Sequence, residues 1–268
     1  MKKGLLWLSL LAAVTAFLYW QNFSLQRENC ILSSSQLPEA FQNFRIVQLS
    51  DLHGRIFGTE QEALLKAVVK SRPDIICITG DLFDEKTDLS TLPVLLTGLA
   101  QIAPTYYVTG NHEWQVDGLS EILAQMEALG VCVLENEYVL LEREGQSLVL
   151  GGVHDPCGPY DQKTPAELVT EIRQKEGENT CILMLSHRND TLELWAELGV
   201  ELVLAGHCHG GVVRLPWAGG LIGSGRQLFP QYDAGAYTKE ATTLYVSRGL
   251  GDFRLFNRPH LPLLILQS

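Results

Sequence analysis

Short apolar runs and amphipathic stretches alternate along the chain from residue 44 onward. The apolar runs are typical of buried strands and lie at residues 45–50, 74–79, 105–109 and 131–134. The amphipathic stretches repeat their apolar positions with the period of a helix and lie at residues 59–71, 92–100 and 119–129. Alternation of this kind predicts parallel strands with helices on the faces of the sheet. We therefore expect an α/β domain.

The second half of the chain keeps the strands but shortens the connections between them. Strands are predicted at residues 138–141, 147–153, 181–186, 202–205, 212–215, 242–247 and 263–266. This pattern favours two sheets packed face to face with helices outside them. Residues 217–237 combine glycine with aromatic side chains, which predicts a long irregular loop of the kind that is often functional.

The first residues form a separate, uniformly apolar segment. Residues 4–20 contain no charged side chain, and a helix of that length reaches about 25 Å, the short end of what crosses a bilayer. We expect a retained transmembrane helix rather than a cleaved signal peptide, because apolar residues continue past the small-residue site at 14–16. The aromatic pair Tyr19 and Trp20 stands where an interfacial belt would.

Composition divides the chain into three predicted parts. Residues 1–22 are the membrane anchor, residues 23–43 are a polar tether, and residues 44–268 are the folded domain. A short strand or helix that lies on the domain is the alternative for the polar segment. The two lysines at positions 2 and 3 predict a cytoplasmic N-terminus. The domain of this single-pass protein is then expected outside the cytoplasm, at the cell membrane.

Potential metal ligands follow five of the predicted strands. They are Asp51 with His53, then Asp81, Asn111, His187, and the pair His207 and His209. Because ligand sites in α/β sheets lie outside the carboxyl ends of strands, we expect these side chains to converge. Glycines at positions 80, 110 and 206 let the backbone turn sharply beside them.

The residue types fit a pair of divalent cations. Such a pair, with the ions about 3.5–4 Å apart, needs a bridging carboxylate and terminal carboxylate and imidazole ligands. Asp81 is the predicted bridge, and Asp51 and His53 would bind one cation from a single loop. Asn111 adds a neutral amide oxygen, and the three later histidines complete the two sets of ligands. The sequence therefore predicts a dinuclear metal site.

The order of the motifs, D-x-H, GD-xx-D, GNH-E, H and GH-x-H, resembles the signature of the calcineurin-like metallophosphoesterase superfamily from about Phe44 to the C-terminus. The GH-x-HGG ending, the segment 245–251 and the apolar N-terminus are similar to a membrane-associated bacterial branch that includes UDP-diacylglucosamine diphosphatases and phosphodiesterases. The resemblance implies a four-layer α/β/β/α sandwich. It also implies a phosphodiesterase or diphosphatase that acts on a membrane-associated or small phosphate ester.

The resemblance further implies roles for individual residues. One metal would take Asp51, His53, Asp81 and His209, and the other would take Asp81, Asn111, His187 and His207. His112 would face the scissile phosphate and stabilise charge or protonate the leaving oxygen. Mn²⁺ is the expected metal, with Fe or Zn²⁺ as alternatives for the same mixed oxygen and nitrogen ligands.

Charge and motif completeness bear on the possible functions. The net charge of -11 argues against a nucleic-acid groove. The expected partners are a small or lipid-linked phosphate ester and, through the N-terminal helix, the membrane. The alternative function is a catalytically silent metal-binding sensory or interaction module, which would lack ligands or His112, whereas all are present. A phosphatase or nuclease released from the cell is a third hypothesis.

Several residues near the motifs have two interpretations. Arg188 would bind a substrate phosphate or pair with Asp190 on the surface. Asp84 would orient the ligand loop as a carboxylate behind the ligands, or take a plain surface or capping role. His154 and His260 are expected to be structural or solvent-facing histidines rather than ligands. Five aromatic residues would form an apolar wall for substrate or simply pack the loops, and they are Trp114, Trp217, Phe229, Tyr232 and Tyr237.

Overall fold

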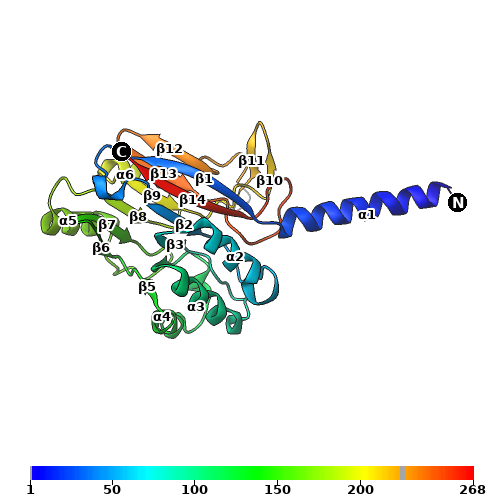
Figure 1. Ribbon diagram of the computed structural model, residues 1–268, viewed down its shortest axis with the longest axis horizontal. Helices are drawn as coiled ribbons and strands as arrows, with labels where there is room; N and C mark the ends of the chain where they lie inside the picture. Colours follow the sequence, from blue (N-terminus) through cyan, green and yellow to red (C-terminus); the bar gives the residue numbers. More distant parts are fainter. Residues whose placement is uncertain (1, 224–226) are drawn as a thin grey trace.

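In this computed structural model, the described residues, 2–223 and 227–268, form two six-stranded sheets that pack face to face (Figure 1). The first sheet has the strand order β1-β14-β2-β3-β4-β5. Its strands are β1 (Gln26–Ser33), β2 (Arg45–Leu49), β3 (Ile75–Thr79), β4 (Thr105–Val108), β5 (Val131–Val133) and β14 (His260–Gln267). Strands β2 to β5 are parallel, whereas β14 is antiparallel to β2 and β1 is parallel to β14.

The second sheet has the strand order β12-β13-β9-β8-β7-β6. Its strands are β6 (Glu137–Arg143), β7 (Gln146–Gly152), β8 (Ile182–Leu185), β9 (Leu202–Ala205), β12 (Gly235–Lys239) and β13 (Thr242–Val246). Strands β7, β8, β9 and β13 are parallel, and the two edge strands are antiparallel to their neighbours.

The glycine-rich stretch 217–237 contains more regular structure than the predicted loop. It holds strand β11 (Gly219–Ile222), which pairs with β10 (Val213–Leu215) in a hairpin, and the start of β12. Residues 224–226 of this stretch lie outside the described part of the chain.

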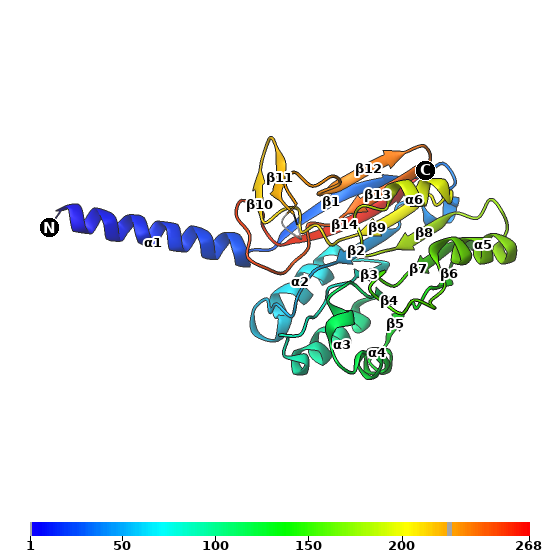
Figure 2. The same cartoon turned by 180° about the vertical axis from the view of Figure 1, so that it is seen from behind.

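Helices cover the outer faces of both sheets. On the first sheet lie α2 (Glu62–Ser71), α3 (Leu92–Ile102) and α4 (Leu119–Ala128), and on the second lie α5 (Pro165–Glu176) and α6 (Leu192–Glu197). Short 3-10 helices occur in the connections at η1 (Glu39–Phe41), η2 (Thr59–Gln61), η3 (Leu89–Thr91) and η4 (Glu113–Gln115). This arrangement is visible from both sides of the molecule (Figures 1 and 2).

Buried side chains alternate between the two faces of each sheet, as the pleat of a strand requires. In β3, Ile76 and Ile78 pack against the helices of the first sheet, whereas Ile75 and Cys77 face the other sheet. In β8, Met184 packs against α5 and α6 while its neighbours face the first sheet. Among the described residues, apolar cores thus separate helix, sheet, sheet and helix. The predicted four-layer α/β/β/α sandwich is confirmed.

The N-terminal segment projects from the sandwich as a long helix, α1 (Lys2–Phe23) (Figure 1). Residues 3–23 are long and apolar enough to cross a membrane, and nearly all of their side chains are exposed. The segment expected as a tether, residues 23–43, instead contains strand β1, which pairs with β14 along its whole length. A strand lying on the domain, the alternative for this segment, therefore describes it better than a tether does.

Burial between the sheets predicts that two leucines contribute unequally to the free energy of unfolding. Leu183 of β8 is fully buried between the sheets, whereas Leu140 of β6 is 39% exposed. We expect Leu183→Ala to lower the free energy of unfolding by about 2–5 kcal/mol, because the surrounding core cannot close the cavity. Urea unfolding of the detergent-solubilised chain measures this. The matched change Leu140→Ala should cost well under half as much, and equal losses would contradict the assigned layers.

Candidate metal centre

The carboxyl ends of strands from both sheets meet at one edge of the sandwich. The loops that follow β2, β3 and β4 come from the first sheet, and those that follow β8 and β9 come from the second. Within the described chain, their side chains form two groups that could hold a metal ion. One group is Asp51, His53, Asp81 and His209, and the other is Asp81, His187 and His207, with the ligating atoms of each group within 4.8 Å of one another.

Asp81 belongs to both groups and lies between them. Its Oδ2 is 3.2 Å from Nε2 of His187 and 3.8 Å from Nε2 of His53. On one side, Nδ1 of His207 lies 3.2 Å from Nε2 of His187. On the other side, Nε2 of His209 lies 3.7 Å from Oδ1 of Asp51. The donors of four separate loops, including the loop of Asp81 itself, therefore converge around one carboxylate.

Several of these donors are buried without a hydrogen-bond partner among the described residues. They are Oδ2 of Asp51, Nε2 of His53, Oδ1 of Asn111 and Nδ1 of His209. Leaving a polar atom buried and unpaired costs about 1–3 kcal/mol for each group. Ligation of a cation would satisfy these atoms, and carboxylate, amide and imidazole donors suit divalent transition metals. The residues present thus fit a metal pair.

The backbone at the donors adopts a conformation that most residues avoid. Five of the predicted ligands have positive φ angles, namely Asp51 (50°), His53 (48°), Asp81 (50°), His207 (67°) and His209 (56°). Such conformations are uncommon for residues other than glycine and cluster at functional sites. Hydrogen bonds between the loops hold them, since the N–H of His53 donates to the carbonyl of Asp81 at 3.0 Å and the N–H of His207 donates to Oδ1 of Asp51 at 2.9 Å.

His187 is oriented by the strand beside it. Its Nδ1 lies 2.8 Å from the carbonyl oxygen of Thr79, which fixes Nδ1–H as a donor and leaves Nε2 directed at Asp81. Burial alone would lower the pKa of His187, but the carboxylate of Asp81 outweighs burial and raises the pKa to about 10. Burial acts on the pKa of Asp81 in the opposite sense, and the charge of His187 nevertheless holds that pKa below its ordinary value. Each of the two side chains therefore favours the charged form of the other.

Glu113 holds two of the ligand loops together, a role that the sequence did not suggest. This fully buried carboxylate accepts hydrogen bonds from the N–H groups of Asp81 (3.0 Å), Leu82 (2.6 Å) and Gly110 (2.8 Å). Burial, followed by the charge of Asp81, raises the pKa of Glu113 to about 7. The available signal was the glutamate that ends the GNH-E motif.

Arg188 lies at the edge of the centre and pairs with a different residue from the one expected. Its guanidinium makes a two-point ion pair with Asp155, at 2.5 and 2.9 Å, rather than with Asp190. Its Nη1 lies 3.1 Å from Nε2 of His207. Burial and then the positive charges of His187 and Arg188 lower the pKa of His207 to about 3. A neutral imidazole is the form that binds metal.

His112 and two acidic residues complete the surroundings of His53. The ring of His112 meets that of His53 edge-on, with centroids 5.0 Å apart, and the backbone N–H of His112 donates to Oδ1 of Asp81 at 2.9 Å. Oδ2 of Asp84 lies 3.7 Å from Nδ1 of His53, and its Oδ1 accepts from the hydroxyl of Thr87 at 2.8 Å. Asp252, which the sequence did not single out, lies 3.9 Å from His53 and 3.7 Å from His209.

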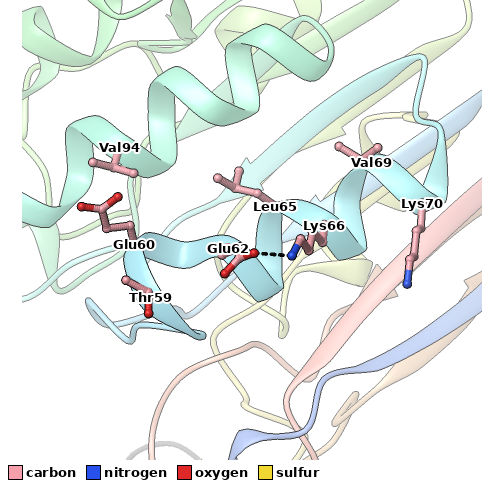
Figure 3. A pocket seen from close by; sticks show the side chains of 8 residues that line it. All are labelled: Thr59, Glu60, Glu62, Leu65, Lys66, Val69, Lys70 and Val94. Atoms are coloured by element: carbon pink, nitrogen blue, oxygen red, sulfur yellow. Dashed lines mark hydrogen bonds and ion pairs between the residues drawn. The ribbon is translucent and has the colours of Figure 1, made fainter.

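The remaining histidines lie outside both groups of donors. Nδ1 of His154 contacts the hydroxyl of Thr109 at 2.9 Å, and Nε2 of His260 lies 3.3 Å from Glu28. Both rings are buried, as expected of structural histidines. A groove beside α2 is lined by Leu65, Val69 and Val94 among others, and its lining residues include none of the predicted metal ligands (Figure 3).

The aromatic residues near the motifs are divided between packing and exposure. Trp114 donates to the hydroxyl of Thr109 at 3.0 Å, and the rings of Tyr232 and Tyr237 lie 4.9 Å apart. These three pack the loops. Trp217 and Phe229 are 83% and 66% exposed.

Comparison with known proteins identifies this geometry. The profile of the calcineurin-like phosphoesterase family matches residues 44–211. The chain belongs to this family. Members use two divalent metal ions to hydrolyse phosphate esters, so the chain is a metal-dependent phosphoesterase. The resemblance seen in the motifs is thereby confirmed.

Relatives resemble the chain well beyond the motifs. It is 28% identical to the metallophosphoesterase YkuE of Bacillus subtilis (strain 168), over 88% of this chain and 84% of that protein. It is 28% identical to the phosphodiesterase YaeI of Escherichia coli (strain K12), over 83% and 82%. A Bos taurus transmembrane protein with a metallophosphoesterase domain is 31% identical, over 87% of this chain and 55% of that protein. Among solved structures, TT1561 of Thermus thermophilus covers 78% of this chain and 90% of its own, at 13% identity and a TM-score of 0.48.

The three hydrogen bonds to Glu113 predict the effect of replacing its carboxylate. In Glu113→Gln, one acceptor oxygen becomes an NH₂ group that faces a backbone N–H, so at least one buried N–H loses its partner. We expect the free energy of unfolding to fall by about 1–3 kcal/mol. Metal affinity, measured by chelator competition, should fall by about 10–100-fold because the ligand loops loosen. The exposed Glu121→Gln is the matched control, and indistinguishable affinities would contradict this role of Glu113.

Proposed function

We propose that the protein hydrolyses a phosphodiester or diphosphate bond in a membrane-associated or small phosphate ester. The observation that carries this proposal is the pair of donor groups that share Asp81. Separate mononuclear sites would need no common carboxylate, whereas hydrolysis by two metals requires both ions within a few ångströms of one phosphate. The phosphodiesterase YaeI is one of the relatives that this chain resembles.

The proposed ligands follow the two groups. One cation would be held by Asp51, His53, Asp81 and His209, and the other by Asp81, Asn111, His187 and His207. Asn111 joins the second set because its buried Oδ1 has no other partner among the described residues. When bound, the cations supply Lewis acidity to the phosphate and lower the pKa of water. Mn²⁺ is the proposed metal, with Fe or Zn²⁺ as alternatives.

The chain's own residues would orient the substrate and manage its protons. His112 lies beside His53 at the partly exposed side of the centre. There it is placed to donate a proton to the leaving oxygen or to stabilise its charge. Arg188 is fixed by Asp155 and adds a positive charge next to His207, which favours an approaching phosphate.

The proposed location is the cell membrane. Helix α1 would anchor the chain in a single pass, with the N-terminus in the cytoplasm and the catalytic domain outside. Residues 1–22 would form this anchor, and residues 44–268, completed by strand β1, would form the catalytic domain. Anchoring would raise the local concentration of lipid-linked substrates.

The shared carboxylate predicts coupled metal loss. We expect purified protein to hold about two Mn²⁺ ions per chain after reconstitution, as measured by inductively coupled plasma mass spectrometry. Asp81→Asn should lower the occupancy of both sites together, because it weakens the ligand common to both. The exposed Asp161→Asn serves as the control. Loss of a single ion from Asp81→Asn would argue against a bridge.

A substitution at His112 is predicted to impair catalysis without impairing metal binding. We expect His112→Ala to keep its metal yet hydrolyse bis(p-nitrophenyl) phosphate about 10²–10⁴-fold more slowly, because a positioned proton donor is lost. His260→Gln, at a buried histidine outside both donor groups, should retain most of the activity. If the metal-loaded wild-type chain hydrolyses no phosphate ester, the chain is instead a silent metal-binding module. Equal rates for His112→Ala and wild type would remove His112 from the reaction.

A further inference from the structure

The metal centre and the membrane helix lie at the same end of the molecule. Strand β1 follows α1 directly and runs parallel to β14 but opposite to β2. The start of β1, next to α1, therefore lies at the end of the sheet where β2 delivers Asp51. Both views show the loop between β13 and β14 at this end, beside the base of α1 (Figures 1 and 2).

The last turn of α1 is fixed to that loop by side-chain hydrogen bonds. Asn22 is buried, and it accepts from the N–H of Arg254 at 2.9 Å and donates to the carbonyl of Arg254 at 3.1 Å. Gln21, also buried, accepts from the N–H of Phe256 at 2.6 Å. Helix and loop therefore have a defined relative position, so the depth of one in a membrane sets the depth of the other.

Two phenylalanines of this loop lie alongside the apolar part of α1. Phe256 is 55% exposed, and its ring centroid is 6.0 Å from that of Phe17. Phe253 is 61% exposed and lines a crevice together with Thr15, Leu18 and other residues of the helix. Six helical residues separate Phe17 from the end of α1, which places these rings about 9 Å along the helix from its base.

The apolar run is too short for α1 to cross the hydrocarbon layer while this loop remains in water. Residues 4–20 already approach the minimum for crossing a hydrocarbon layer of about 30 Å. If the helix entered the bilayer only beyond the loop, residues 4–14 would remain, and they would span only about 16 Å. The loop must therefore share the depth of residues 15–20 if α1 crosses the membrane.

The side chains around the base of α1 suit the boundary between headgroups and acyl chains. The guanidinium of Arg55 lies 4.7 Å from the ring of Phe23, and that of Arg258 lies 4.8 Å from the ring of Trp20. Aromatic rings are enriched at this boundary, and arginine side chains extend from it toward lipid phosphates. Exposed phenylalanines next to such arginine side chains are typical of a segment that inserts into the membrane interface.

We propose that residues 252–256, which we name the interfacial loop, form a second membrane contact that inserts Phe253 and Phe256 into a phospholipid bilayer. This inference rests on the proposed anchoring by α1. The interfacial loop begins at Asp252, whose carboxylate lies within 4 Å of His53 and His209. The metal centre is therefore held against the lipid surface, and its substrate is a phosphate ester presented at that surface.

Depth-dependent quenching tests the proposal on the full-length chain. In a Cys157→Ser background, which removes the exposed cysteine, Phe253→Cys and Phe256→Cys are labelled with the fluorophore NBD and reconstituted into phosphatidylcholine vesicles. Labels at both positions should be quenched by nitroxide lipids. Their quenching by aqueous iodide should be about fivefold weaker than that of a label in water, because the rings lie below the headgroups.

Two further labels define the limits of the measurement. Ser147→Cys, exposed near the start of β7 at the opposite end of the sandwich, gives the value for water. Leu10→Cys, in the middle of α1, gives the value for the membrane interior. Iodide access at positions 253 and 256 equal to that at 147, with position 10 protected, would overturn the interfacial loop alone. Access at position 10 as well would overturn both the loop and the anchor. Hydrolysis of bis(p-nitrophenyl) phosphate by the same samples tests the proposed chemistry independently.

Discussion

The carboxylate of Asp81 is the group on which the arrangement of the centre depends. One of its oxygens faces histidines from both sheets, and the other accepts the N–H of His112. Its own N–H is held by Glu113. Because ligand distances around a metal vary by only a few tenths of an ångström, the two sheets cannot slide past each other at this edge without loss of the site. The inter-sheet core supplies the rigidity that this requirement demands.

The left-handed backbone at five donors adds a second constraint. Each such residue costs of order 1–3 kcal/mol unless its surroundings impose the conformation. Here the cost is offset by the largely buried strands that precede the turns and by cross-loop hydrogen bonds such as that from the backbone N–H of His207 to Asp51. The fold is therefore more than a support for the ligands, since its packing energy keeps them in a conformation that an isolated loop would abandon.

Much of this organisation could be predicted from local patterns. Buried strands such as β3 and β8 are continuous apolar runs, and the seven donors were predicted because each stands near the point where such a strand ends. Strand β1 was harder to predict because its residues are largely polar and exposed, and its partner β14 lies at the other end of the chain. Asp252 and the pair Arg188–Asp155 depend on how distant loops approach each other, which no local periodicity encodes.

The pairing of β1 with β14 also shapes how the chain must be assembled. Strand β14 lies between β1 and β2, so within the described residues it is the only link in the first sheet between β1, which follows α1, and the strands that lead to Asp51 and Asp81. A ribosome completes α1 and β1 long before it reaches β14. During synthesis the nascent chain therefore exposes both the unpaired strand β1 and the open edge of the sheet at β2 until β14 has been made. Late, long-range closure of this kind is slow. The protein is therefore most exposed to misassembly in the interval before β14 pairs with β1 and β2.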